Sequence, residues 1–391
     1  EMQRSLVGSE MCIRDSSSIM KTTSSLQRKN LNMDYNVQSN IKKTVFSDIK
    51  EITNTNVDWN RFNGKTVLIT GAGGFIGYYL VLTFLARNDF YNNNIKLLAF
   101  VRNRERAEKK FGVLLERDDI ELVVADVTNK IECERADFII HAASQASNIQ
   151  FETDPVGTIN ANLSGTSNIL DFALESKSEA VLVVSSLKVY GALHNGKNSI
   201  SEDDIGYIDF TSYKNCYAVG KRASETLAAS YCKQFGLNVK IARPSYIYGA
   251  SSLTDDRVWA QFIANVVRHE NILLKSNGAA NRSFCYVTDT VSALIYIMLN
   301  GENVTPYNIS YEKSDTTIRN FAKTACEVFP ERNMTLAFAN PEDEKEPEVD
   351  TSALAKTPEI LDSSRLCSLG WKPLVDLKEG IRRAVGILEE N

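Results

Sequence analysis

The chain has 391 residues, of which 43% are hydrophobic and 24% are charged, a composition typical of a globular protein with one large core or two fused lobes. Its formal net charge is −5, so the basic surface of a nucleic-acid-binding protein is not expected. No apolar run reaches the ~18 residues of a membrane-spanning helix. The seven cysteines form no CxxC pair, which predicts reduced thiols in a cytoplasmic protein. The three histidines lie too far apart in the sequence to predict a metal site.

The amino-terminal region contributes little to the fold prediction. Residues 1–16 show no periodicity and resemble translated adapter sequence, so they are set aside, with Met20 or Met33 as a plausible start. The following residues, up to 42, are rich in Ser, Asn, Lys and Thr, which predicts disorder. An extension at 43–63 then carries apolar residues at helical spacing, which predicts a short amphipathic helix. These residues are Val45, Phe46, Ile49 and Ile52.

Strand-like and helix-like segments alternate from Lys65 onwards. This alternation predicts βαβ units and an α/β fold with a doubly wound parallel Rossmann sheet. We expect an NAD(P)-binding domain at 64–245 and, at 246–391, mainly a smaller, discontinuous substrate-binding lobe. The strands are expected at 66–70, 95–101, 122–125, 138–142, 180–185, 239–242, 283–287 and 307–309. The later helices are expected at 104–115, 156–174, 212–235, 258–269, 290–299, 318–329 and 377–388.

A glycine-rich turn follows the first predicted strand. Gly71, Gly74 and Gly77 stand at a spacing of three, between the apolar run TVLIT and a long apolar helical segment. In this context the first glycine permits a sharp turn, the second lets a pyrophosphate approach the backbone, and the third lets the helix pack closely on the sheet. The helix N-terminus would face the anion. A purely structural glycine turn is the alternative reading.

A tyrosine, a lysine and a serine are the candidate catalytic residues. Tyr217 and Lys221 are four apart on a predicted helix, so both lie on one face. A nearby ammonium stabilises a phenolate, which makes a phenol usable for proton transfer. Ser185 and Ser186 end a buried-type strand at the edge where ligands bind. The alternatives are a surface Tyr–Lys pair and serines that bond the local backbone.

Seven motifs stand together in one order, and with them the chain resembles the extended short-chain dehydrogenase/reductases of the nucleotide-sugar epimerase/dehydratase/decarboxylase group. The resemblance covers about residues 64–388. The motifs are GAGGFIG at 71–77, Asp126, HAA at 141–143, NLSGT at 162–166, SSLKVYG at 185–191, YAVGK at 217–221 and RP at 243–244.

The resemblance implies roles for individual residues. It implies Ser186 as the catalytic hydroxyl, Tyr217 as the acid/base and Lys221 as its partner, with Tyr217 and Lys221 also contacting the cofactor. It further implies cofactor contacts from Gly71, Gly74, Phe75, Ile76, Gly77, Asp126, Val127, Ala142 and Ala143. For the substrate it implies Arg282 on the diphosphate, with Arg257 as a second candidate and an exposed ion pair as the alternative. Ser186 and Tyr246 complete the expected substrate contacts.

The resemblance implies a reaction that begins with transient oxidation of a sugar C4 hydroxyl. Dehydratases of the group carry an Asp-Glu pair where Leu187 and Lys188 stand, and decarboxylases carry a Glu where Lys188 stands. This departure favours a 4-epimerase, with a decarboxylase or 4,6-dehydratase as alternatives. The stretches around 256–257 and 282–287 look more like the decarboxylases, and Tyr246 stands where the group often has Asn. A carbonyl reductase that consumes NADPH and a non-catalytic dinucleotide-binding protein remain further alternatives.

The cofactor is expected to be NAD or NADP. An acidic residue normally ends the second strand to bind an NAD ribose, but here the strand is followed by Arg102, Asn103 and Arg104. Arg102 or Arg104 could bind a 2′-phosphate and favour NADP, or could simply begin a solvated helix. Enzymes of the group usually retain NAD, which favours NAD. Members of the group are usually homodimers that act on nucleotide sugars. We therefore expect a homodimer with a nucleotide-sugar substrate.

Overall fold

The computed structural model describes residues 41–194, 196–345 and 358–390. Nearly all of the predicted disordered tail lies outside these ranges.

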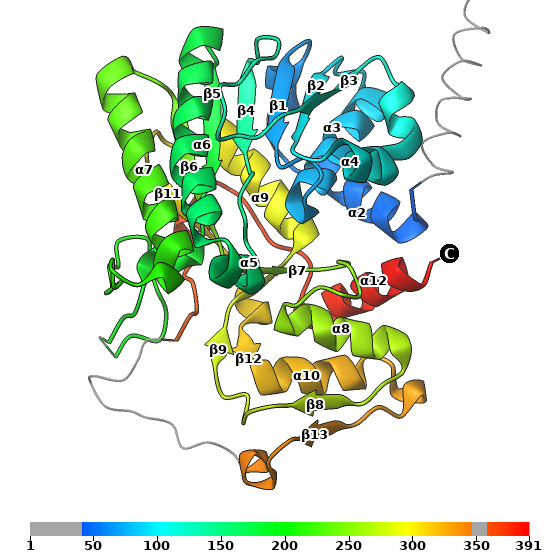
Figure 1. Ribbon diagram of the computed structural model, residues 1–391. Coiled ribbons are helices and arrows are strands. Elements are labelled where there is room, and N and C mark those ends of the chain that lie inside the picture. The colour runs from blue at the N-terminus through cyan, green and yellow to red at the C-terminus, as the bar shows by residue number, and fades with distance from the viewer. Residues whose placement is uncertain (1–40, 195, 346–357, 391) are drawn as a thin grey trace, which may run out of the picture.

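A seven-stranded, all-parallel sheet forms the centre of the described chain, and it confirms the predicted doubly wound α/β fold (Figure 1). The order is β3-β2-β1-β4-β5-β6-β11, so the direction of winding reverses between β1 and β4. Strands β6 and β11 lie beyond β5. Strand β11 comes from the region expected to be mainly the substrate lobe. The bounds are β1 Thr66–Thr70, β2 Lys96–Val101, β3 Ile120–Val124, β4 Phe138–His141, β5 Ala180–Val184, β6 Val239–Pro244 and β11 Pro306–Ile309.

Alternate residues of each central strand face opposite layers of helices. Val67 and Ile69 of β1 belong to one apolar cluster, whereas Leu68 belongs to the other. The first cluster is covered by α2 (Lys43–Thr53), α3 (Phe75–Tyr91) and α9 (Val287–Asn300), and the second by α6 (Pro155–Ser176) and α7 (Cys216–Phe235). Strands buried on both faces read as continuous apolar runs, which is why the sequence predicted them well.

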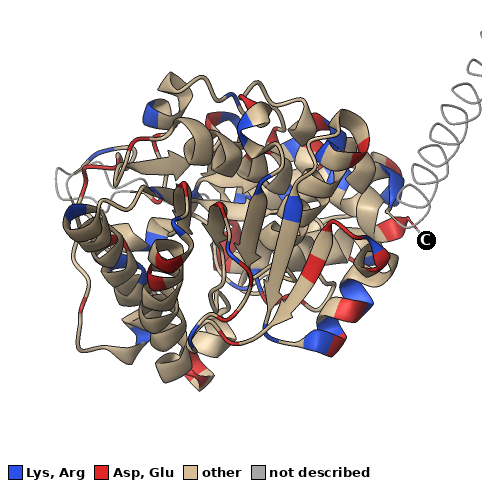
Figure 2. Ribbon diagram, turned by 90° about the horizontal axis from the view of Figure 1, so that it is seen from above, with Lys and Arg blue, Asp and Glu red and all other residues tan. Residues whose placement is uncertain are grey.

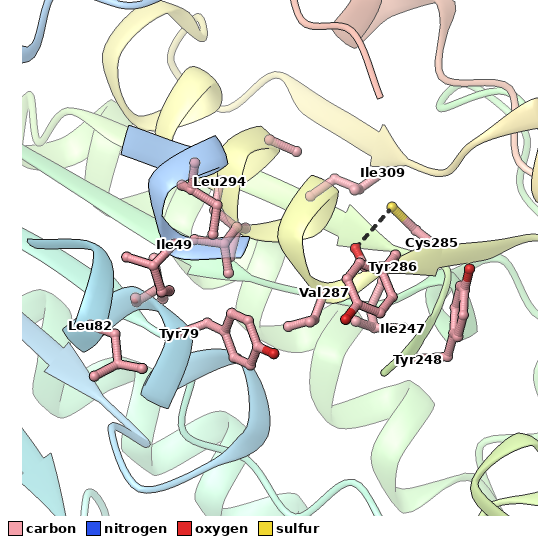
Figure 3. Packing of buried hydrophobic residues seen from close by; sticks show 14 of the residues in the cluster. Ile49, Tyr79, Leu82, Ile247, Tyr248, Cys285, Tyr286, Val287, Leu294 and Ile309 are labelled. Atoms are coloured by element: carbon pink, nitrogen blue, oxygen red, sulfur yellow. Dashed lines mark hydrogen bonds between the residues drawn. The ribbon is translucent and has the colours of Figure 1, made fainter. Parts of the chain in front are cut away.

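The amino-terminal helix α2 is part of the core. Figure 3 shows Ile49 of α2 beside Leu82 of α3 and Leu294 of α9. The buried carboxylate of Asp48 accepts a hydrogen bond from Tyr286 at 2.9 Å and pairs with Arg383 of α12 (Leu377–Glu389) at 2.9 Å. The predicted amphipathic helix therefore connects the two ends of the described chain.

A smaller lobe lies beyond the carboxyl ends of the strands (Figure 1). It contains α8 (Val258–Arg268), α10 (Ile318–Glu327) and three two-stranded pairs. These pairs are β7 (Tyr246–Tyr248) with β10 (Phe284–Tyr286), β9 (Asn281–Arg282) with β12 (Thr316–Thr317), and β8 (Ile272–Leu274) with β13 (Leu336–Phe338). Of these strands the sequence predicted only β10, because two or three residues are too short to show a period.

Positions of Lys and Arg are interspersed with positions of Asp and Glu along the ribbon in Figure 2. No described helix combines the length and the apolar character needed to cross a membrane. Among the described residues, no three His, Cys, Asp or Glu side chains gather where they could hold a metal ion.

Candidate functional site

A cleft of about 310 Å³ opens at the carboxyl ends of β1 to β4, where the order of the strands reverses. Parallel sheets bind nucleotides at such a reversal. Six of the residues expected to contact a cofactor line it directly: Gly71, Gly74, Arg102, Asp126, Val127 and Ala143. Ala142 borders Gly71 through its carbonyl. Phe75 and Ile76 begin α3, where backbone N–H groups have no partner within the helix.

The glycine turn is shaped by contacts within the protein as much as by space for a ligand. Gly71 has a φ of +70°, which favours glycine. A Cβ on Gly77 would lie 2.2 Å from the carbonyl oxygen of Gly71, so close packing of the helix requires this glycine. A Cβ on Gly74 would also meet that oxygen, at 2.9 Å. Gly73 has room for a Cβ and lines the cleft. The turn and the helix N-terminus therefore fit a pyrophosphate group.

Basic residues surround the far end of this cleft. Arg102 lines it, as expected, but Arg104 does not: its guanidinium points to Glu108 at 3.2 Å, and both side chains are exposed. Of the two arginines offered as alternatives for a 2′-phosphate, Arg102 alone lines the cleft, since Arg104 begins α4 (Arg104–Phe111) and is exposed. Arg106, which the sequence analysis missed, lines the cleft instead. Lys110, one turn later, donates to the carbonyls of Gly73 and Gly74 at 3.0 and 3.1 Å.

The candidate catalytic residues lie together where β5 and α7 end and begin. Ser186 follows β5, and its hydroxyl accepts a hydrogen bond from the backbone N–H of Lys188 at 3.2 Å. Lys221 lies one turn further along α7 than Tyr217, with its ammonium 5.8 Å from the centre of the Tyr217 ring. Burial raises the pKa of Tyr217, while the Ser186 hydroxyl and the charge of Lys188 oppose that rise.

The ammonium of Lys221 is buried and donates to the carbonyl of Val184 at 2.8 Å. Burial lowers its pKa to about 8, and Glu225 opposes that change. His141, at the end of β4, lies nearby but is held between Thr70 and Thr166, at 2.8 and 3.2 Å. Complete burial lowers the pKa of His141 to about 3, so it stays neutral and has a structural role.

Close packing of α7 on α6 fixes the position of Tyr217 and Lys221. A Cβ on Gly220 would lie 3.0 Å from the Cβ of Asn162, so the two helices approach closely at this point. The hydroxyl of Ser224 donates to the carbonyl of Asn162 at 2.8 Å. The motif at 162–166 therefore acts by holding the helix that carries the candidate acid/base.

The two serines at the end of β5 have different surroundings. Ser185 donates to Glu225 at 2.5 Å, and Glu225 makes a paired contact with Arg243 at 2.7 and 3.0 Å. The buried Glu225–Arg243 pair lies behind the site, and Glu225 accepts the hydrogen bond of the Ser185 hydroxyl. The hydroxyl of Ser186 instead accepts from the N–H of Lys188 at 3.2 Å. The sequence alone could not show this difference, because both hydroxyls end the same strand.

A cluster of charged and phenolic side chains continues the site into the smaller lobe. Lys188 contacts the hydroxyl of Tyr246 at 2.8 Å and both carboxylate oxygens of Glu359 at 3.3 Å. The guanidinium of Arg282 lies 3.2 Å from the same carboxylate. Two residues expected to contact substrate, Tyr246 and Arg282, are thus brought together with Ser186. Glu359 was missed, and no motif around it marks it as functional.

Arg257 lies apart from this cluster. Its guanidinium pairs with Asp255, at 2.9 Å from Nε and at a shorter second contact, and stacks on Trp259 with 4.5 Å to the ring centre. It also lies 5.7 Å from the ring of Phe75, which begins the helix after the glycine turn. Arg257 therefore lies beside the start of the helix that follows the glycine turn, whereas Arg282 lies in the cluster around Lys188.

The extended short-chain dehydrogenase/reductases combine a doubly wound sheet, a glycine turn after its first strand and an adjacent second lobe. This chain has all three features. The chain belongs to the NAD dependent epimerase/dehydratase family, whose profile matches residues 67–310. It is an enzyme family, and its members modify nucleotide sugars.

Curated relatives resemble the chain over most of its length. It is 33% identical to UDP-glucuronic acid decarboxylase 6 of Arabidopsis thaliana over 319 residues, which are 81% of this chain and 86% of that protein. It is 29% identical to UDP-glucuronic acid decarboxylase 1 of Danio rerio over 322 residues, which are 82% of this chain and 72% of that protein.

Solved structures show the same fold. A UDP-glucose 4-epimerase of Thermotoga maritima matches with a TM-score of 0.67 and 20% identity, over 83% of this chain and 98% of that one. A UDP-glucuronic acid 4-epimerase of Bacillus cereus, solved with UDP-glucuronic acid and NAD, matches with a TM-score of 0.65 and 18% identity, over 83% and 99%.

Proposed function

We propose that this enzyme oxidises the C4 hydroxyl of a nucleotide sugar transiently, with Tyr217 as the acid/base. The observation that carries the proposal is the placement of Tyr217 and Lys221 at the end of β5, where the Lys221 ammonium lies 5.8 Å from the Tyr217 ring and donates to the carbonyl of Val184 at 2.8 Å. Ser186 follows that strand, at the same sheet edge as the glycine turn. A sugar hydroxyl that met Tyr217 and Ser186 could lose its proton to Tyr217 while Ser186 held its oxygen. The diphosphate would extend toward Arg282, whose planar fork suits phosphate oxygens.

The residues have different proposed roles in the first step. Tyr217 takes the hydroxyl proton, and Ser186 orients the oxygen that becomes the C4 carbonyl. A bound nicotinamide dinucleotide would supply the acceptor for the C4 hydride and could return it. Lys221 would contact the ribose of that dinucleotide and stabilise the phenolate, since an adjacent cation favours the charged form of a phenol.

The net reaction that we favour is 4-epimerisation. Return of hydride to the other face of a 4-keto sugar needs no carboxylate beyond the Ser–Tyr–Lys group. At the position after Ser186 stands Leu187, and Lys188 follows it. A lysine has the opposite charge to the acidic residues that the dehydratases and decarboxylases of the group carry there.

Decarboxylation of a UDP-hexuronate is the second candidate, and two observations favour it. The curated relatives are named UDP-glucuronic acid decarboxylases. In addition, the carboxylate of Glu359 lies against Lys188, so the acidic group that is absent from position 188 is present in the same cluster. This contact weakens the argument against decarboxylation that the lysine at position 188 provides.

We infer that the dinucleotide site is able to take NADP as well as NAD. Several structural neighbours were solved with NAD, which supports NAD as the cofactor. Against this, the cleft is lined by Arg102 and Arg106, and its one acidic residue, Asp126, is bound to the backbone and hydroxyl of Thr128. A 2′-phosphate would meet two guanidinium groups. Arg102→Asp should then weaken binding of NADP+ by tenfold or more, and binding of NAD+ far less.

We also infer a homodimer formed through α6 and α7. Val156 and Leu163 are exposed on α6 and lie two turns apart, on one face of that helix. Burial of this face against a second copy would remove apolar area from water. Light scattering on the purified protein tests it. Val156→Glu together with Leu163→Glu should give a monomer, whereas a wild-type monomer would contradict the inference.

The central experiment incubates the purified protein separately with UDP-glucose and UDP-glucuronic acid and follows the products by mass spectrometry. An isomer of unchanged mass would support epimerisation, and loss of carbon dioxide would support decarboxylation. Consumption of NADPH with a ketone in place of redox-neutral turnover would favour a reductase. If neither sugar reacts while dinucleotide is bound, and a wider panel of nucleotide sugars also fails, the proposal is wrong.

A further inference from the structure

A lysine outside the glycine motif holds the turn that follows β1. The ammonium of Lys110, in the last turn of α4, donates to the carbonyl oxygens of Gly73 and Gly74 at 3.0 and 3.1 Å. Both glycines line the cleft at the end of β1. The contact joins the glycine turn to the helix that follows β2, 36 residues further along the chain.

Aromatic packing holds Lys110 beside the turn. Its ammonium lies 4.6 Å from the centre of the Tyr78 ring, and the next residue, Phe111, is buried and packs on the same ring at 5.8 Å. Among the described residues, no carboxylate lies within ion-pair distance of this ammonium. Burial lowers the pKa of Lys110 to about 8, and Arg106 acts in the same direction. At pH 7 the lysine therefore carries a charge that no described acidic partner neutralises.

The two carbonyls that Lys110 binds set the direction of the N–H groups that follow them. A peptide group is planar, so a fixed carbonyl oxygen also fixes the N–H of the next residue, which points to the opposite side. The carbonyl of Gly73 is linked in this way to the N–H of Gly74, which donates to the carbonyl of Gly71 at 2.8 Å and closes the turn. The carbonyl of Gly74 is linked to the N–H of Phe75, the first residue of α3, where an N–H has no partner within the helix. Lys110 thus restrains the turn and an N–H at the helix N-terminus, where an anion binds.

The turn needs an external restraint because it is rich in glycine. Three of the four residues at 71–74 are glycines, and glycine loses more conformational freedom on ordering than any other residue. At Gly73 a Cβ would meet only Val101 within 4 Å, at 3.6 Å, so few neighbouring atoms hold this residue in place. A turn that is ordered before its ligand arrives binds that ligand more tightly, because the cost of ordering is not taken from the binding free energy.

We propose that Lys110 is a positioning residue of the dinucleotide site, which holds the peptide groups of Gly73 and Gly74 so that the start of α3 is ready to bind a pyrophosphate. The inference rests on the proposed function only in taking this cleft as the dinucleotide site, and it does not depend on which nucleotide sugar reacts. Lys110 acts through the carbonyl groups of the turn and is not among the residues that line the cleft. Its charge adds to the attraction of the site for phosphate.

The first experiment measures the turn without a ligand. Hydrogen exchange of the full chain, freed of copurified nucleotide with charcoal, is followed by mass spectrometry at pH 7 for the wild type, Lys110→Met and Lys109→Met. Loss of the contact should speed exchange by about fivefold or more in the peptide that covers 71–78, and should leave β5 and β6 unchanged. Lys109 is exposed, so Lys109→Met removes a neighbouring charge without the contact and should match the wild type. Unchanged exchange at 71–78 in Lys110→Met, or faster exchange throughout the chain, would overturn the proposal.

Nucleotide binding by the same proteins gives a second readout, by calorimetry for ADP and NAD+ and by ligand-observed NMR for adenosine. In Lys110→Met the affinities for ADP and NAD+ should fall by roughly fivefold to thirtyfold, whereas the affinity for adenosine, which has no phosphate, should stay the same. Lys110→Arg keeps the charge and the donors, and should lie closer to the wild type than to Lys110→Met.

Three results would overturn the role of Lys110 while leaving the dinucleotide site intact. They are equal ADP affinities in the wild type and Lys110→Met, equal losses for ADP and adenosine, as a purely structural role would give, and a Lys110→Arg variant as weak as Lys110→Met. A wild type that bound neither ADP nor NAD+ would instead contradict the dinucleotide site itself, and the role of Lys110 with it.

Discussion

Lys188 and Glu359 stand 171 residues apart in the sequence, yet the ammonium of the first lies 3.3 Å from both carboxylate oxygens of the second. Backbone pairing makes the contact possible, because the N–H of Ser283 donates to the carbonyl of Glu359 at 3.0 Å. The segment that contains Glu359 therefore runs beside β9 and reaches the end of β5. This relationship gives the site an acidic group that the motif at 185–191 lacks.

Tyr217→Phe removes the proposed acid/base while it keeps the ring that stacks on Phe151 at 4.9 Å. We expect turnover of the nucleotide sugar to fall by about 10²–10⁴-fold, since loss of a general acid/base typically costs that much. Binding of UDP, measured by calorimetry, should be unchanged. Tyr213→Phe is the control, because Tyr213 is exposed and its hydroxyl donates to Glu152 at 2.9 Å. A Tyr217→Phe enzyme within a few-fold of wild type would contradict the assignment.

Gly73→Ala and Gly77→Ala should affect different properties. A Cβ on Gly73 meets Val101 at an ordinary 3.6 Å, so stability should change by less than about 0.5 kcal/mol. The added methyl would nevertheless enter the cleft and weaken dinucleotide binding. A Cβ on Gly77 collides with backbone at 2.2 Å, so that variant should lose thermal stability even without ligand. Calorimetric melting and binding titrations distinguish the two, and equal melting temperatures would count against this account of the turn.

Arg282→Met should weaken binding of UDP and of UDP-sugars, and should leave binding of the dinucleotide unchanged. A hydrogen bond to a charged group is worth about 1.5–3 kcal/mol, which corresponds to roughly a tenfold to hundredfold loss of affinity. Titration of the variant with UDP and with NAD+ measures both effects. Unchanged UDP affinity would remove Arg282 from the substrate site and favour Arg257 in its place.

Asp315→Asn should change how stability depends on pH. Burial raises the pKa of the Asp315 carboxyl from 3.8 to about 7, against a hydrogen bond from Ser283. The folded state thus holds this proton more tightly than the unfolded state, so the stabilisation is complete below pH 3.8 and is lost as the pH rises through 7. Asn keeps an acceptor for Ser283 and cannot ionise. The free energy of unfolding should therefore fall less between pH 5 and 8 in the variant than in the wild type.

The size of this difference should be about 1–2 kcal/mol, since Asp315 is only partly buried and solvent screens its charge. Chemical denaturation at several pH values measures it. Parallel pH profiles for the two proteins would show that Asp315 ionises normally in the folded state.

Several features could be predicted because they depend on neighbours in the sequence. The strands of the sheet are buried on both faces, so they read as apolar runs, and the glycine spacing fixed the place of the turn after β1. The four-residue separation of Tyr217 and Lys221 fixed their common face on α7. These are local consequences of helix and strand periodicity.

The sequence could not show which of several equivalent side chains would meet the cleft. Arg104 and Arg106 share a helix and differ only in the direction in which they point. Ser185 and Ser186 end one strand, and only the packing of α7 gives Glu225 to Ser185, whereas the Ser186 hydroxyl accepts from the N–H of Lys188.

By itself, the amino-acid sequence determined the doubly wound sheet, the nucleotide turn and the family, because each is written in a contiguous motif or a short period. The tertiary structure alone decided that Glu359 joins Lys188, Tyr246 and Arg282 beside Ser186. Contacts between residues so far apart depend on the pairing of whole segments, and no local pattern encodes the charge that one segment brings to another.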